Sequence, residues 1–254
     1  MDEKSAFEIG RLYPLVKAIA DTLTTSQKDV FIRLPGLIAY WTGGTRGVNA
    51  ALSDHSGSAL PLSETGVCQT GYDGNPFVHL GDGTNYFDSS AAFFGQSGAA
   101  AWIDDSIKGL TLGLWVLADA TPSVGVGVMS KSGGVTDRGY AVIWNSTGLQ
   151  FLVSSNGAAT FVSPILPATA VGVWHFVVGR FIPSAEVAIF VDGVKAVLTA
   201  GIPATINAPA QNFEIGRHFN DNTRILHGRA RDMFICAAAL SDQLIEEIRV
   251  TSVP

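Results

Sequence analysis

Charged residues are scarce in this sequence. Only 15% of its 254 residues are Asp, Glu, Lys or Arg, whereas 47% are hydrophobic. A disordered chain has the opposite balance, because dense charge with little apolar surface prevents a packed core. The composition therefore predicts a folded globular protein, and the length suits one large domain with or without an appendage.

An excess of basic residues is also missing. The 16 Lys and Arg residues are outnumbered by 22 Asp and Glu residues, which gives a formal net charge of −6. Proteins that bind nucleic acid usually carry a basic excess, so we expect no nucleic-acid partner. No stretch approaches the roughly 18 uninterrupted apolar residues of a membrane-spanning helix, so we expect no membrane insertion.

Cysteine is nearly absent. The two cysteines, Cys68 and Cys236, are too few for a disulfide scaffold and show no spacing typical of a metal site. Whether they pair with each other stays open. The first residues, Met1 to Lys4, lack the basic region and apolar core of a signal peptide. We therefore expect synthesis in a cytoplasm without export by the usual route.

The common catalytic motifs are missing. The chain has no Gly-x-Ser-x-Gly elbow, His-Glu-x-x-His helix, phosphate loop or Gly-x-Gly-x-x-Gly fingerprint. Asp54, His55 and Ser56 include the residue types of a catalytic triad, but neighbours on one turn cannot form its successive hydrogen bonds. We predict a turn instead, in which the Asp54 side chain accepts backbone N–H groups and Gly57 has a positive φ.

The segment 5–34 has a helical rather than a β pattern, because apolar residues recur at spacings of three and four. We predict that residues 1–36 form a short helical arm for docking or oligomerisation, which Pro35 and Gly36 end. Packing of this arm on the chain's own β domain is an equally open alternative. The apolar stripe consists of Ile9, Leu12, Val16, Ile19 and Leu23.

Short runs of Val, Ile, Phe, Trp and Tyr alternate with turn-forming clusters from residue 37 onward, as in an all-β sandwich. Asp192 and Gly193 lie between two such runs and predict a type I′ hairpin, in which both residues need a positive φ. Ser241 is expected to cap a short C-terminal helix over residues 243–249. The predicted strands are 37–41, 76–80, 110–118, 124–130, 139–144, 149–154, 160–162, 173–181, 186–191, 194–198, 212–216 and 229–236.

Several segments carry, in one order, the motifs of a known family. They are residues 37–41 (LIAYW), 54–57 (DHSG), 73–78 (DGNPFV), 110–116 (LTLGLWV), 173–181 (VWHFVVGRF), 189–193 (IFVDG) and 228–245. Together they resemble the laminin-G-like or concanavalin A-like lectin/glucanase jelly-roll family. The resemblance implies an all-β, two-sheet antiparallel jelly-roll sandwich over residues 37–254, flanked by the N-terminal helical arm and the short C-terminal helix.

The stretches FVVGRF, EVAIFVDGVK and CAAALSD further resemble lectin-like domains of tailed-bacteriophage virion proteins. This resemblance implies a non-enzymatic structural protein of the virion, such as a decoration, tail or baseplate component, with a role in surface attachment. The implied partners are other virion proteins, further copies of the chain in a homo-oligomer such as a trimer, and a cell-surface glycan. The alternative is a carbohydrate-binding module or lectin outside a particle.

Some members of the family are β-glucanases with a Glu-x-Asp-x-x-Glu pattern on one strand. No glutamate of this chain is followed two residues later by an aspartate, so a glucanase of that type is excluded. A glycoside hydrolase with another carboxylate pair is the third alternative.

Glycan binding needs an exposed aromatic ring beside polar side chains. Trp102 with Asp104 is the best such combination, whereas Trp115, Trp144 and Trp174 fall inside predicted strands and are expected in the core. Two polar loops are further candidate contact sites, although both also fit simple hydrophilic turns. Their residues are Asp137, Arg138 and Tyr140 in the first, and His218, Asn220 and Asp221 in the second.

Arginines gather near the C-terminus. We expect Arg217, Arg224 and Arg229 to contribute to a charged subunit interface, and Arg231 belongs to the same cluster. The alternative is solvated strand ends in surface ion pairs. Some relatives hold calcium with loop carboxylates. We assign no metal ligand and leave calcium open at the loop residues Asp73, Asp82, Asp88, Asp104 and Asp105.

Overall fold

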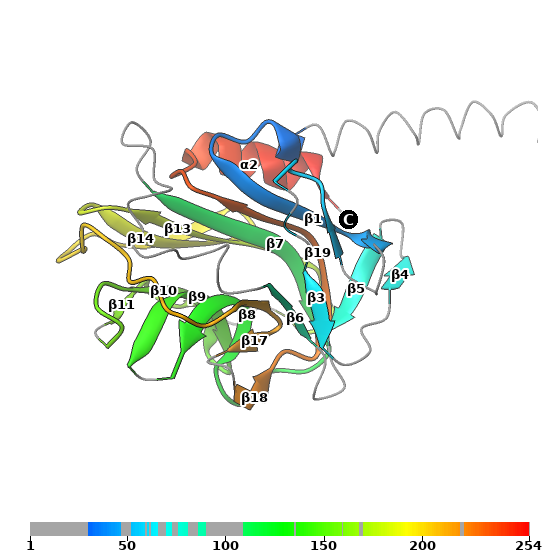
Figure 1. Ribbon diagram of the computed structural model, residues 1–254, viewed down its shortest axis with the longest axis horizontal. Helices are drawn as coiled ribbons and strands as arrows, with labels where there is room; N and C mark the ends of the chain where they lie inside the picture. The colour runs from blue at the N-terminus through cyan, green and yellow to red at the C-terminus, as the bar shows by residue number, and fades with distance from the viewer. Residues whose placement is uncertain are drawn as a thin grey trace, which may run out of the picture.

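The computed structural model describes residues 30–46, 52–58, 60, 62–65, 70–72, 76–80, 86–89, 109–134, 136–158, 160–167, 170–218 and 221–253. Two antiparallel sheets face each other, and a C-terminal helix packs on the outer face of one of them (Figure 1). This is the predicted jelly-roll sandwich. No helix in the described segments is long and apolar enough to cross a membrane.

The first sheet, sheet A, has the strand order β15-β14-β13-β7-β19-β1-β2, and β5 pairs with β19 beside β1 and with β4. Its strands are β1 (Leu37–Arg46), β2 (Leu52–Asp54), β4 (Thr70–Tyr72), β5 (Pro76–Leu80), β7 (Leu110–Ala118), β13 (His175–Ile182), β14 (Glu186–Val191), β15 (Val194–Leu198) and β19 (Gly228–Cys236).

The second sheet, sheet B, has the order β11-β10-β9-β8-β16-β6-β3, and β12 pairs with β10. Its strands are β3 (Ser63–Thr65), β6 (Tyr86–Ser89), β8 (Val126–Gly133), β9 (Asp137–Asn145), β10 (Gly148–Ser154), β11 (Thr160–Val162), β12 (Leu166–Pro167) and β16 (Phe213–Ile215). A separate hairpin of β17 (Arg217–His218) and β18 (Asp221–Ile225) follows β16.

The main core lies between the two sheets. Alternate residues of β7 face it, and among them Leu112, Leu114 and Val116 are fully buried. Burying an aliphatic side chain of this size contributes about 1.5–3 kcal/mol. Trp115 has the opposite orientation and belongs to a second cluster on the outer face of sheet A.

The helix α2 (Asp242–Thr251) covers part of that outer face with its buried Ile245 and Ile248. Residues 30–32 are helical and lie on the same side of sheet A (Figure 1). There Phe31 is fully buried and stacks on Tyr40 with ring centroids 4.4 Å apart. The predicted stripe, Ile9 to Leu23, lies outside the described residues.

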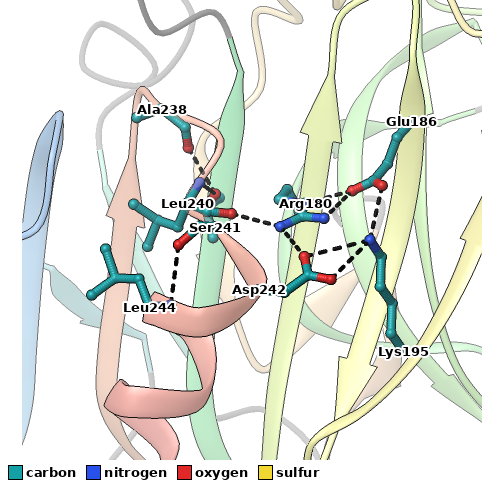
Figure 2. A network of polar contacts seen from close by, with 9 residues as sticks. Arg180, Glu186, Lys195, Ala238, Leu240, Ser241, Asp242 and Leu244 are labelled. Carbon is teal, nitrogen blue, oxygen red and sulfur yellow. Dashed lines mark hydrogen bonds and ion pairs between the residues drawn. The ribbon is translucent and has the colours of Figure 1, made fainter.

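A polar network fastens α2 to sheet A (Figure 2). The buried guanidinium of Arg180 on β13 binds Glu186 of β14 through Nη2 at 2.5 Å and Asp242 through Nη1 at 2.5 Å. It also donates to the Leu240 carbonyl at 2.6 Å. Lys195 of β15 bridges the two carboxylates at 2.9 and 3.3 Å. Four elements are therefore joined by one charge cluster.

Three local predictions are confirmed. Asp192 and Gly193 have φ values of 51° and 87°, as a type I′ hairpin requires. The Ser241 side chain accepts the Leu244 N–H at the start of α2. Asp54 accepts the N–H groups of Ser56 at 2.8 Å and Tyr40 at 3.0 Å, and Gly57 has φ 89°.

Other boundaries differ from the prediction. The predicted polar loop with Asp137, Arg138 and Tyr140 is strand at these residues, because β8 continues to Gly133 and β9 begins at Asp137. The helix α2 is longer than predicted, and the short strands β2, β3, β4, β6, β12, β17 and β18 have no counterpart among the predicted ones.

Candidate ligand-binding surface

Part of the outer face of sheet A carries polar and aromatic side chains instead of aliphatic ones. Where β5 pairs with β19, Arg229 lies directly opposite His79. Strand alternation directs Val78 and Leu80 into the core, so Phe77 and His79 lie on the outer face. The His79 and Phe77 rings meet edge to face with centroids 5.1 Å apart.

Arg231 lies beside these rings, opposite Trp115 of β7. Its side chain is only 1% exposed. The guanidinium carbon is 4.8 Å from the ring centroid of Trp174 and 5.8 Å from that of Trp115, so both contacts are cation–π interactions. Trp115 in turn donates its indole N–H to Ser252 at the end of α2 at 2.8 Å.

Trp174 contacts two members of this arrangement, Phe77 and Arg231. It precedes β13, yet its centroid is 6.0 Å from that of Phe77 on β5, although β7 and β19 lie between these strands in the sheet. The ring therefore extends across the sheet surface above Arg231. It is partly exposed but packs against the apolar cluster on the outer face of sheet A, so the prediction that Trp174 belongs to the core holds only in part.

The guanidinium carbon of Arg229 lies 5.1 Å from the Phe77 centroid. Arg229 and His79 are both partly exposed. We refer to Phe77, His79, Trp174, Arg229 and Arg231 together as the aromatic–arginine patch. Phe77 and Arg231 are buried, and the partly exposed members combine the Trp174 ring with the N–H donors of Arg229 and His79. Sugar-binding sites use this combination.

A second polar region surrounds the β17–β18 hairpin. His218 is 1% exposed, and its pKa is lowered to about 3, because burial and the charges of Arg224 and Arg138 disfavour the imidazolium ion. Arg224 pairs with Asp221 at 3.3 Å and donates to the Gly125 carbonyl at 3.3 Å. The hairpin therefore brings the two predicted polar loops together.

A cleft of about 210 Å³ adjoins this hairpin. It is formed by the β7–β8 connection around Thr121 and Ser123 and by Thr223, Ile225 and His227. Its lining contains no aromatic ring other than the imidazole of His227, so it offers a weaker platform for a sugar ring than the aromatic–arginine patch.

Residues 94–246 match the family model described as the concanavalin A-like lectin/glucanases superfamily, which covers more than half of the chain. The chain belongs to this superfamily. The resemblance drawn from the sequence motifs is thereby confirmed, and the domain is a lectin-like jelly roll. No curated protein sequence matches the chain significantly.

Solved structures share this superfamily fold. Botulinum neurotoxin type C, which depends on interaction with two ganglioside molecules to enter cells, aligns with TM-score 0.63 and 16% identity over 84% of this chain and 51% of its own. The binding domain of botulinum neurotoxin DC in complex with SialylT aligns with TM-score 0.64 and 14% identity over 85% and 52%. This chain spans about half the length of these toxin structures.

A third solved structure has a length similar to that of this chain. It is domain 4 of AbnA, a GH43 extracellular arabinanase from Geobacillus stearothermophilus, in complex with arabinotriose. It aligns with TM-score 0.60 and 14% identity over 84% of this chain and 97% of its own. At this level of identity the likeness shows a common fold.

Of the residues predicted to bind a ligand, Trp102, Asp104 and Asn220 lie outside the described residues. Tyr140 is 3% exposed and packs near Phe213 in the core, so it cannot act as a surface contact. Burial also raises the pKa of its hydroxyl.

Of the predicted contact residues, the structure brings Arg138, His218 and Asp221 together. Burial and the charge of Arg138 lower the pKa of His218, and the charge of Asp221 raises it. Asp137 begins β9 and is partly exposed. Of the predicted interface arginines, Arg217 is buried, forms an ion pair with Glu214, and lies 3.7 Å from the Tyr86 ring centroid. It is thus occupied within the chain, whereas Arg224 and Arg229 reach the surface.

Sequence reasoning missed Phe77 and His79 and placed Trp174 in the core. The available signal was the Phe-x-His spacing of β5, which places both rings on one face of a strand. In the described segments no three His, Cys, Asp or Glu side chains gather into a candidate metal site. Cys236 is a free, buried thiol with a raised pKa due to burial, while Cys68 lies outside the described residues.

Proposed function

We propose that this chain is a non-catalytic carbohydrate-binding domain of a tailed-bacteriophage virion, and that the aromatic–arginine patch contacts the glycan. The observation that carries the proposal is the position of Trp174, which is partly exposed across sheet A with Phe77 and Arg229 at its border. The apolar face of a sugar ring packs on an aromatic ring, and its hydroxyl groups accept hydrogen bonds from neighbouring N–H groups.

The solved structures of the same fold support this proposal by analogy. Gangliosides, SialylT and arabinotriose are named with three of them. Function lies in a site and not in a fold, so the proposal depends on the patch of this chain and not on these ligands.

The non-catalytic part of the proposal is supported by the carboxylates around Arg180. Retaining glycosidases need one carboxyl group that stays protonated as a general acid. Burial raises the pKa of Asp242, but the hydrogen bond and the charge of Arg180 outweigh it and lower the pKa overall. Glu186 is ion-paired to Arg180 and Lys195. This pair therefore serves the attachment of α2.

The virion part of the proposal is supported by the resemblance of residues 176–195 and 236–242 to phage lectin-like domains. In this proposal residues 1–36 attach the domain to further copies or to another virion protein. Antibody labelling of purified particles in electron microscopy tests the location, and absence from all particles would overturn it. Deletion of residues 1–29 should lower the number of chains per oligomer in light scattering, and an unchanged number would contradict the role of the arm.

The glycan-binding part is tested with a glycan array on the whole chain. We expect binding that the substitution Trp174→Ala abolishes and Trp174→Phe largely retains, because Phe preserves a smaller ring. Val173→Ala is the matched control, since Val173 is an exposed neighbour outside the patch. A blank array, or full binding by Trp174→Ala, would overturn the assignment of this function to the patch.

A further inference from the structure

We infer that the glycan of the aromatic–arginine patch carries a carboxylate, which Arg229 and His79 bind. This inference rests on the proposed function and specifies its substrate class. It depends on the charge of the patch, on the geometry of its donors, and on the position of the aromatic rings beside them.

Arg229 differs from other arginines of the chain in its electrostatic partners. Arg180 binds Glu186 and Asp242, Arg217 binds Glu214, and Arg249 binds Glu246. For Arg229, no carboxylate of the described segments lies within ion-pair distance, and its contact is the Phe77 ring. A partly exposed guanidinium of this kind favours an anionic ligand, because its N–H groups match the oxygens of a carboxylate.

His79 supplies a second donor at the same place. It lies directly opposite Arg229 in the β5–β19 ladder, and directly opposite residues have Cβ atoms about 4.5–5.5 Å apart. A guanidinium presents parallel N–H groups that match the two oxygens of a carboxylate. An imidazole N–H beside it can donate to the same group even when the ring is neutral.

The rings beside these donors favour a sugar acid over a small anion. From Trp174 through Phe77 to Arg229 the steps are 6.0 Å between centroids and 5.1 Å from centroid to guanidinium carbon. Phe77 is buried and Trp174 is partly exposed, so a sugar ring that packs on Trp174 points its substituents past Phe77 toward Arg229. A small anion would gain nothing from these rings, because their contribution is apolar contact.

The test uses pairs of ligands that differ only in charge. A panel of acidic oligosaccharides, including sialyllactose and tetragalacturonic acid, is measured by calorimetry or array against the methyl esters of the same sugars. We expect the acids to bind the wild-type chain at least about tenfold more tightly than the esters, as a charged hydrogen bond predicts. This difference should shrink as salt is added.

Arg229→Gln should abolish the preference for the acid over its ester, whereas Arg229→Lys should retain part of it. Arg224→Gln is the matched control, because Arg224 is a partly exposed arginine on the β17–β18 hairpin. A wild-type far-UV spectrum and melting temperature verify that each variant folds. Equal binding of acids and esters would overturn this inference and leave the proposed function standing. Absence of binding to every acid of the panel would also overturn the inference, whereas a blank glycan array would overturn both.

Discussion

Trp174 covers Arg231 on the outer face of sheet A, with the guanidinium carbon 4.8 Å from the indole centroid. From the sequence we expect Arg231 in an arginine cluster at a subunit interface or at solvated strand ends, whereas the structure buries it beside this ring. The next residue, Asp232, has φ 48° and accepts the Tyr40 hydroxyl at 2.9 Å. The patch thus depends on a cation that supports its largest ring.

The first prediction concerns this support. Arg231→Met keeps most of the buried volume but removes the cation–π contacts to Trp174, which contribute about 1–2 kcal/mol when desolvated. We expect the ring to lose its fixed position, so glycan affinity should fall about tenfold and acrylamide should quench Trp174 fluorescence more strongly. Subtraction of the Trp174→Phe spectrum isolates that signal. Arg224→Met is the control, and unchanged affinity in Arg231→Met would contradict the role of the cation.

The second prediction concerns the attachment of α2. Arg180→Met removes the shared partner of Glu186 and Asp242 from a buried site, and Lys195 then remains as their cation. Loss of one partner from a buried charge cluster typically costs several kcal/mol, so we expect the free energy of unfolding to fall by about 3 kcal/mol. Urea denaturation measures this change.

The matched control for that experiment is Lys195→Met. Its ammonium is more exposed than the Arg180 guanidinium, so its ion pairs should contribute only about 0–1 kcal/mol. If both variants lose the same stability, Arg180 has no special part in holding the helix.

The sheets follow from the sequence to a large extent, because their signals are local. The run 110–118 alternates between the two faces of β7, and the Asp-Gly pair at 192–193 fixes the hairpin of β14 and β15. Short strands such as β3 and β17 are not predictable in this way. Two or three residues carry no periodicity, and their pairing depends on distant partners.

The candidate site is less predictable than the fold, because three distant segments supply it. Phe77, Trp174 and Arg229 meet through the pairing of β5 with β19, of β19 with β7 and of β7 with β13. The exposed position of Trp174 depends further on where it enters β13. A run of hydrophobic residues assigns such a tryptophan to the core, because the run does not show that the strand begins only at the next residue, His175.

The third prediction concerns pH. His175 Nδ1 and Asp192 Oδ2 are 2.6 Å apart. For His175, burial lowers the pKa, but the Asp192 hydrogen bond and charge, with the Ala170 carbonyl, raise it overall. For Asp192, burial raises the pKa, but the bonds from His175 and the Phe176 N–H lower it overall. The pair is therefore charged over a wider pH range in the folded protein than in the unfolded chain.

The directions of these two pKa shifts define the pH range in which the ion pair stabilises the fold. The raised pKa of His175 gives stability that is complete below its unfolded value of 6.5 and lost as pH rises through the folded value. The lowered pKa of Asp192 gives stability that is complete above 3.8 and lost as pH falls through the folded value. We expect wild type to exceed Asp192→Asn in unfolding free energy most between about pH 4 and 6.5. Asn-Gly preserves the hairpin, so parallel pH profiles would contradict the coupling.

The fourth prediction concerns the β17–β18 hairpin, which crosses β8 at Gly127. A Cβ atom at this position would lie 2.0 Å from the Arg217 carbonyl oxygen, and both partners are backbone-fixed. Gly127→Ala should therefore displace the hairpin and lower the free energy of unfolding by about 1–3 kcal/mol, as overpacking does. Gly125→Ala is the matched control, because the nearest atom there is a flexible Arg224 nitrogen at 3.8 Å. Equal stability of the two variants in urea denaturation would show that the backbones of β17 and β8 are not packed too closely for a Cβ atom at Gly127.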